Sequence, residues 1–317
     1  MQFTPLALLL LAAAPAFAAA HYDPDQDRAA LRQAASSSYN AATLAAGVPL
    51  VPERAAEIRA DLDESLARAN DASTAAKNLE TAAVKRAAEM AGELKGHGAP
   101  APSADAKDLS DAAALQRARW KSLSKDHDDL QARVFALPDT NRDKADLKST
   151  LRAAGDSLAA ADAALGRAEA DASAAADTVA QMELADKRAR SSAAELTPQD
   201  TEVIRLADSL PPPVSEAKDA TGLLGQEPQG PNRTRAGAKI SVPRDLTSQM
   251  YSAADRACNR ADDYHGRSSA FDRALASFAL AKSSGASDLA AAKSALDKAD
   301  ASQAGVRDRL DHPKPQP

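Results

Sequence analysis

The segment Lys-Asp-His-Asp-Asp-Leu at residues 125–130 concentrates ionisable side chains, and His127 lies among its three aspartates. These residue types could bind a metal ion or act as an acid–base pair. Successive residues of an α-helix point in different directions, so these carboxylates cannot converge on the imidazole. No second histidine stands four residues away, and a zinc site needs three or four ligands. We therefore expect neither a metal site nor a catalytic site here.

Three polar residues stand where the surrounding sequence repeats apolar residues. They are Glu80, Gln116 and His127. Polar residues at such positions fix the register or the number of packed helices at some cost in stability. We predict this role for all three. A pH-sensitive packing role for His127 is the alternative, and a stability profile that is flat between about pH 5 and 8 would exclude it.

Cys258 is the only cysteine of the chain. In an exported protein a lone cysteine either forms a disulfide with a second chain or stays an unpaired, half-buried thiol. Trp120 is the only tryptophan, and its place among apolar residues predicts core packing. We find no paired nucleophile and base, no phosphate-binding loop and no cluster of ligands. The sequence therefore predicts no catalytic residue, no cofactor and no enzyme.

The elements that hold these residues follow from the spacing of apolar side chains. Between residues 103 and 137 an alternating spacing of four and three residues is sustained by Leu109, Ala113, Gln116, Trp120, Leu123, His127, Leu130, Val134 and Leu137. Residues 62–94, 147–182, 250–278 and 289–310 follow the same rule. A repeat of 3.5 residues predicts packed, left-handed supercoiled helices.

Prolines divide the chain into helical intervals, because a proline inside a helix costs about 3 kcal/mol. The expected helices span residues 24–46, 53–95, 104–137, 141–195, 245–283 and 287–311, with a short one at 198–209. Gly285 is expected to end one helix and Ser287 to cap the next. The apolar phase breaks at Pro138, which predicts a turn between two antiparallel helices. One continuous kinked helix is the alternative.

The predicted fold class is all-α: an elongated antiparallel coiled-coil helical bundle with a C-terminal helical hairpin. We expect the second to fourth long helices to form a three-helix bundle. The predicted divisions are a signal peptide (1–20), an alanine-rich bundle (21–195), a short helix with a Pro/Gly-rich linker (196–243), the helical hairpin (244–312) and a disordered tail (313–317).

Composition limits both the core and the choice of partners. Alanine is abundant and aromatic residues make up only 3% of the chain, so the core must be thin. The net charge is −6, and both signs alternate along the predicted helices. This distribution argues against nucleic acid and against strong attraction to anionic lipid.

The first twenty residues resemble a secretory signal peptide. Leu6 to Ala14 form an apolar stretch too short to span a bilayer, and small residues follow it. We predict cleavage near Ala18–Ala20 and a periplasmic or secreted protein. No later apolar run is long enough for a membrane helix, so we expect a mature chain without one.

These patterns predict a non-enzymatic exported protein that acts through protein–protein contacts. We expect a structural spacer, an adaptor or an assembly factor or chaperone of the cell envelope, with a protein partner or self-association. The alternative is reversible binding to a lipid or membrane surface by amphipathic helices. It is less favoured, because the apolar faces are mostly alanine and the polar faces mix both charges.

Overall fold

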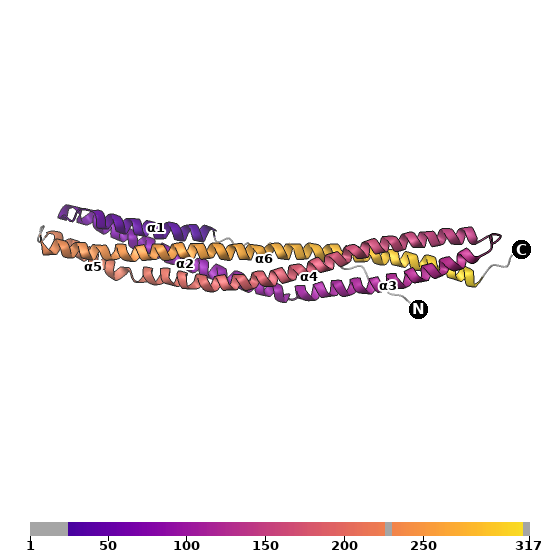
Figure 1. Ribbon diagram of the computed structural model, residues 1–317. Helices are drawn as coiled ribbons and strands as arrows, with labels where there is room; N and C mark the ends of the chain where they lie inside the picture. Colours follow the sequence, from indigo (N-terminus) through magenta and orange to yellow (C-terminus); the bar gives the residue numbers. More distant parts are fainter. Residues whose placement is uncertain (1–24, 226–229, 313–317) are drawn as a thin grey trace, which may run out of the picture. The chain divides into compact units, whose positions relative to one another are not determined.

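The computed structural model describes residues 25–225 and 230–312, and the regular structure of these residues is entirely helical (Figure 1). The predicted all-α class is confirmed. The helices are α1 (Asp25–Gly47), η1 (Pro52–Arg54), α2 (Ala55–Lys95), α3 (Pro102–Ala136), α4 (Lys144–Asp208), α5 (Pro211–Gly222), η2 (Leu223–Gly225) and α6 (Pro231–Asp311). The predicted signal peptide and C-terminal tail lie outside the described residues.

The described residues form two compact units. Unit 1 contains residues 25–86 and 192–265, and unit 2 contains residues 87–191 and 266–312. Three helices, α2, α4 and α6, contribute a segment to each unit, whereas α1 and α5 belong to unit 1 and α3 to unit 2. The predicted division around a linker at 196–243 does not coincide with these units, because α4 and α6 extend into that range.

Pro138 separates α3 from α4, as predicted. Leu137 has φ −63° and ψ 142°, an extended conformation that a following proline favours. Asn141 Oδ1 accepts a hydrogen bond from the backbone N–H of Asp143 at 2.9 Å, and Lys144 Nζ donates to the carbonyl of Leu137 at 2.5 Å. These bonds close a turn between two helices, so the alternative of one kinked helix is wrong.

Two other prolines lie inside helices that the sequence predicts to begin or end there. Helix α4 passes through Pro198 and α6 passes through Pro243. Each proline removes one helical hydrogen bond. Buried apolar side chains offset this cost: Leu196 and Val203 flank Pro198, and Ile240 precedes Pro243. Each contributes about 1.5–3 kcal/mol when fully buried. The expected linker is therefore mostly helical, in α5 and the first turns of α6.

The helical hairpin expected over residues 244–312 is not formed, because α6 continues through Gly285. Gly285 is buried, and a Cβ atom there would lie 2.9 Å from Leu109 Cδ2 of α3 and 3.2 Å from Asp171 Cβ of α4. The glycine therefore permits a close approach of three helices, and the helix end predicted at this residue is wrong.

In unit 2, α3 and α4 run antiparallel. Along α3 the residue number rises from Trp120 to His127, while their contacts on α4 fall from Leu158 to Leu151. The two helices therefore run in opposite directions on either side of the turn at Pro138.

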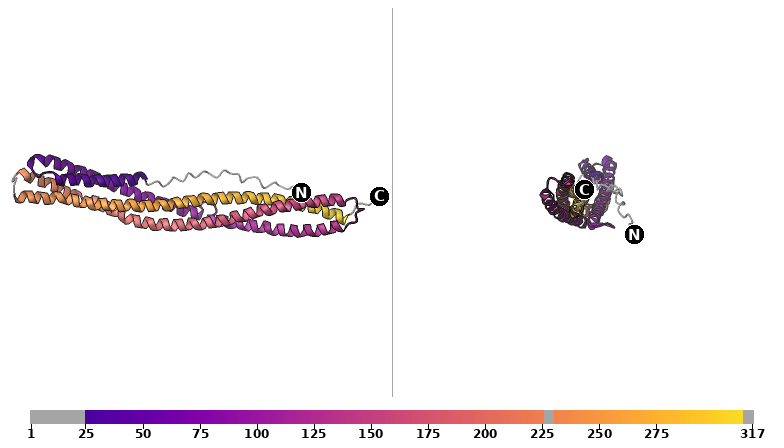
Figure 2. Two further views of the ribbon diagram at one scale, coloured as in Figure 1. Left: turned by 45° about the horizontal axis from the view of Figure 1, so that its top comes forward. Right: turned by 90° about the vertical axis from the view of Figure 1, so that its right-hand side faces the viewer.

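The C-terminal part of α6 completes unit 2 and runs parallel to α3. Asp105 pairs with Lys282 and Arg133 with Asp311, so both residue numbers rise together. The three helices lie side by side in the views of Figures 1 and 2. Their shared core includes Leu123 and Leu158, together with Leu296 of α6. The third helix packed on α3 and α4 is thus α6, where the sequence predicts the helix at 53–95.

Unit 1 packs α1 and α5 with segments of α2, α4 and α6. The Ser38 hydroxyl donates to the carbonyl of Ser65 at 2.8 Å, which joins α1 to α2. The Tyr264 hydroxyl donates to the carbonyl of Ala83 at 2.9 Å, which joins α6 to α2. Alanine is the commonest buried residue of this unit. Its small side chain brings helices close together but supplies little burial energy.

The role of Gly285 can be tested against a second glycine of α6. Gly305 is exposed, and a Cβ atom there would meet nothing within 4 Å. We expect Gly305→Ala to raise the free energy of unfolding by up to about 1 kcal/mol, since alanine favours a helix. Gly285→Ala should give no gain, or a loss of about 1–3 kcal/mol from overpacking. Urea denaturation followed by circular dichroism measures both. Equal stabilisation by the two alanines would contradict the close packing.

Candidate functional site

His127 and Trp120 of α3 each reach a backbone carbonyl of α4. Trp120 Nε1 donates to the carbonyl of Leu158 at 3.0 Å, and His127 Nε2 lies 3.1 Å from the carbonyl of Leu151. A carbonyl only accepts, so Nε2 carries the proton. Gly155 leaves room for the ring, because a Cβ atom there would lie 3.3 Å from Nε2. This bond gives His127 a means of fixing the register of α3 against α4, the role predicted for it.

The aspartates next to His127 have different neighbours. Asp126 pairs with Arg307 of α6 at 3.3 Å, and an oxygen of the exposed Asp128 lies 3.7 Å from His127 Nδ1. Asp129 is exposed. Within the described residues, no three His, Cys, Asp or Glu side chains are grouped so that they could hold a metal ion. Asp126 thus points toward α6, whereas Asp128 lies beside the imidazole.

The other two predicted register residues lie elsewhere. Gln116 of α3 has its Oε1 buried, with no hydrogen-bond partner among the described residues. Glu80 is half-buried on α2 in unit 1. A residue that the sequence does not single out, Gln303 of α6, donates its Nε2 to the carbonyl of Leu123 at 2.9 Å. The polar residues of the packed faces are therefore spread along the helices and do not gather into one site.

Cys258 lies on α6 in unit 1 with no exposed surface. Its Sγ is 3.5 Å from the carbonyl of Arg28 on α1. Burial is the main cause that raises the pKa of the thiol to about 11. The thiol is thus more enclosed than the half-buried group that the sequence suggests. The intermolecular disulfide stays a prediction, and it would require α1 and α6 to separate locally.

One buried carboxyl group of unit 1 escapes prediction from the sequence. Asp200 of α4 has no exposed surface, and neither of its oxygens has a hydrogen-bond partner in the described part of the chain. Burial, and then the negative charge of Glu80, raises the pKa of Asp200 to about 8. The spacing of Leu196, Asp200 and Val203 places it on the packed face. The expectation that one helix ends at residue 195 and a separate short helix begins at Pro198 hides this signal.

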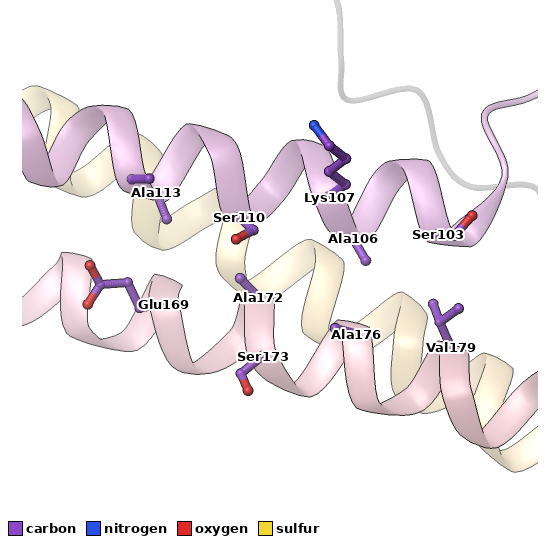
Figure 3. A pocket seen from close by; sticks show the side chains of 11 residues that line it. Ser103, Ala106, Lys107, Ser110, Ala113, Glu169, Ala172, Ser173, Ala176 and Val179 are labelled. Atoms are coloured by element: carbon purple, nitrogen blue, oxygen red, sulfur yellow. The ribbon is translucent and has the colours of Figure 1, made fainter.

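An open groove of about 600 Å³ runs between α3 and α4 in unit 2. Figure 3 shows α3 and α4 on either side of the groove, with α6 passing behind them. Most of its lining is small, and Lys107 and Glu169 are the charged residues of the lining. The small side chains are Ser103, Ala106, Ser110, Ala113 and Ala114 on α3 and Ala172, Ser173 and Ala176 on α4.

A second hollow of about 330 Å³ opens between the same two helices, nearer their turn. Its lining residues repeat those of the first after three heptads: His127 follows Ala106 on α3, and Gly155 precedes Ala176 on α4. Residues three heptads apart lie on the same face of a packed helix. The groove and the second hollow therefore open on one face of the α3–α4 pair.

Arg117 lies between the groove and the second hollow along α3. Its Nε and Nη2 donate to the two carboxylate oxygens of Glu169 at 2.8 and 3.0 Å, and its Nη1 donates to Asp162. The guanidinium carbon is 5.4 Å from the centroid of the Trp120 ring. Hydrogen bonding to Glu169 raises the pKa of Arg117 above its usual range, and Arg117 lowers the pKa of Glu169. This network ties α3 to α4 between the two openings.

Comparison with known proteins gave no family model, no curated protein and no solved structure that matches this chain. None of the helices that the structure describes has a stretch long and apolar enough to cross a membrane. The fold and these groups define a helical-bundle protein with an open groove and several enclosed polar side chains.

The enclosure of Cys258 predicts slow chemistry at its thiol. We expect a thiol reagent such as dithionitrobenzoate to react with the native chain far more slowly than with the chain in denaturant, because the thiol is covered and stays protonated at neutral pH. Absorbance of the released product measures both rates. Rapid reaction of the native chain, or a covalent dimer on a non-reducing gel, would show that α1 and α6 open readily.

The Arg117 network can be compared with an exposed ion pair on the same helix. The Arg117 side chain is 20% exposed, whereas the paired side chains of Lys107 and Asp111 are 73% and 63% exposed. We expect Arg117→Met to lower the free energy of unfolding by about 1 kcal/mol and Lys107→Met to have little effect. Because the pKa of Glu169 is lowered, the Arg117 contribution should persist above the usual carboxyl range and be lost at more acidic pH. Urea titrations at several pH values test this, and equal effects of the two variants would contradict it.

Proposed function

We propose that this chain is an exported, non-enzymatic helical protein that acts in the cell envelope through protein–protein contacts. The roles that fit are those of a structural spacer, an adaptor or an assembly factor or chaperone. The groove between α3 and α4 is the observation that carries the proposal. The periplasmic or secreted location is inferred from the N-terminal sequence with its cleavage site near Ala18–Ala20.

The partner that fits the groove is a helix with large apolar residues. On the other side of the α3–α4 pair, α6 already packs in this way: its Leu296 contacts a core that contains Leu123, Leu158 and Ala161. On the groove side, alanine and serine leave the corresponding volume open. Each leucine that a partner buried there would contribute about 1.5–3 kcal/mol.

The length of the open face sets the length of the partner. The groove and the second hollow are three heptads apart on both helices. At 1.5 Å per residue, three heptads span about 31 Å. A partner helix of about thirty residues would therefore contact both openings and pass over Arg117. A helix of the same chain in a second molecule meets this description as well as a different protein does.

The placement of reactive side chains supports a role without catalysis. His127 is bonded to a carbonyl, and Cys258 and Asp200 have no exposed surface. The groove itself offers Lys107 and Glu169, and these are bound to Asp111 and Arg117 respectively. These groups are engaged in packing or in ion pairs, as expected of a protein whose surface makes contacts.

Substitutions in the groove test the proposal. Ala114 and Ala176 line the groove and are exposed, so arginine at both positions would fill it without disturbing the core. Ala291 and Ala304 are exposed on α6 and serve as matched controls. We expect Ala114→Arg with Ala176→Arg to weaken binding of the partner, or self-association, at least tenfold. The control pair should bind as the unaltered chain does, and all variants should keep their helical circular dichroism.

The binding measurements have two arms. Cross-linking in envelope extracts identifies a partner, which is then purified and titrated against each variant, and light scattering measures self-association of the mature chain. If the double variant in the groove binds as well as the double control variant on α6, the contact lies on another surface. A mature chain that stays monomeric and captures nothing would overturn the proposed function.

A further inference from the structure

Asp200 is enclosed in the core of unit 1 without a counter-ion. It has no exposed surface, and no lysine, arginine or other donor in the described residues bonds to either of its oxygens. Glu80 of α2 is close enough for its negative charge to act on Asp200. On α6 the thiol of Cys258 is near Asp200, and the pKa of this thiol is raised mainly by burial and to a lesser degree by Asp200. Burial and the negative charge of Glu80 thus disfavour the ionised form.

The arginines on the nearby turns of α1 and α6 are engaged elsewhere. Arg28 and Arg32 of α1 pair with Asp262 and Asp255 of α6. Arg256 of α6 donates to the side chain of Gln199, the residue before Asp200, at 2.9 Å. Arg260 pairs with Glu195, one turn earlier on α4, at 2.9 Å. A buried carboxylate without a partner is strongly disfavoured, so the closed unit retains the proton. The free-energy cost of ionising Asp200 is removed only when the carboxylate reaches water.

The helix around Asp200 is built so that it can move. Pro198 lies two residues earlier and has no N–H, so the helical hydrogen bond to the carbonyl of Ala194 is absent. Helix α4 ends at Asp208, and residues 209–210 form the turn to α5. The segment 199–208 is therefore bounded by a proline on one side and a turn on the other. Bends in helices are localised at such prolines.

We propose that residues 199–208 of α4 form a proton-controlled latch, closed against α2 and α6 while Asp200 is neutral and released when Asp200 ionises. This inference is independent of the groove in unit 2 and of the partner proposed for it. It adds a means by which pH changes the packing of unit 1.

The direction of the pH dependence follows from the two states. In water a carboxyl of this kind ionises near its usual pKa of 3.8, whereas in the closed unit the pKa of Asp200 is raised to about 8. Opening therefore releases one proton between these limits, and the opening constant rises about tenfold per pH unit. The free energy needed to open the segment is greatest below about pH 4. It falls as the pH rises and becomes constant above about pH 8.

Hydrogen exchange of the mature full chain tests the latch. Protection factors of the amides of residues 199–208, which exclude the intrinsic pH dependence of exchange, are measured between pH 5 and 9. We expect them to fall about tenfold per pH unit up to about pH 8. Protection of α3 in unit 2 should stay unchanged. In Asp200→Asn the fall should be absent.

Two further variants make the test specific. Glu80→Gln removes the neighbouring negative charge, so it should lower the pKa of Asp200 and bring the levelling-off to a lower pH. Glu183→Gln removes an exposed carboxyl from the same helix and should behave as the unaltered chain. The latch is wrong if Asp200→Asn loses protection with pH as the unaltered chain does, or if the unaltered chain keeps constant protection. Asp200→Leu provides the same comparison should the asparagine variant fold poorly.

Discussion

The packing of this protein depends on helices that approach closely through alanine faces. An alanine methyl contributes about 0.8 kcal/mol on burial, against as much as about 3 kcal/mol for a leucine. Alanine is the commonest buried residue among the described residues, with larger side chains such as Leu62, Leu165 and Leu296 at intervals. Contacts must therefore be accumulated over many turns and at short distances between helices. Gly285 shows this requirement directly, because side chains of α3 and α4 lie so near its backbone that a Cβ atom would be in close contact with both.

An alanine face does not by itself define how two helices are aligned, because a shift by one heptad replaces alanine with alanine. Longer polar side chains supply the missing specificity. Between α3 and α6, Asp105 pairs with Lys282, Asp126 with Arg307 and Arg133 with Asp311.

Each exposed pair of this kind contributes at most about 1 kcal/mol, but all of them require nearly the same alignment. The bonds from Trp120 and Gln303 to carbonyls of neighbouring helices impose the same condition from inside the core. A shift of register would break all of these contacts at once. Their combined loss therefore selects one register, although each contact alone adds little to the stability of the fold.

The sequence predicts the local features well and the long-range features poorly. The helical class and the turn at Pro138 depend on residues close together in the chain, and both are confirmed. Pro198, Pro243 and Gly285 mislead for one reason. Their local cost is real, but burial against distant helices outweighs it.

The choice of α6 as the third helix of unit 2 depends on contacts between residues far apart in the sequence. Asp200 is missed as a consequence of the error at Pro198. The repeat of apolar residues along α4 is not followed past the proline, so Asp200 is not recognised as part of the packed face. Of the predicted register residues, His127 has a visible bond to a neighbouring helix, whereas the amide oxygen of Gln116 lacks one.

Because the core is thin, the cost of an unpaired buried polar group is a large share of the folding free energy. An unsatisfied buried oxygen costs about 1–3 kcal/mol, as much as a buried leucine provides. Gln116 and Gln303 each carry such an oxygen, and their cost is the same at every pH because amides do not titrate. Asp200 differs, because its cost depends on whether it holds a proton.

In a core of large apolar residues that variation would be a small fraction of the total stability. In unit 1, where alanine predominates and Pro198 already weakens the helix, the same variation is comparable to the packing energy of several turns. The composition that makes the helices long and closely packed therefore also makes one enclosed carboxyl able to decide whether a segment stays packed.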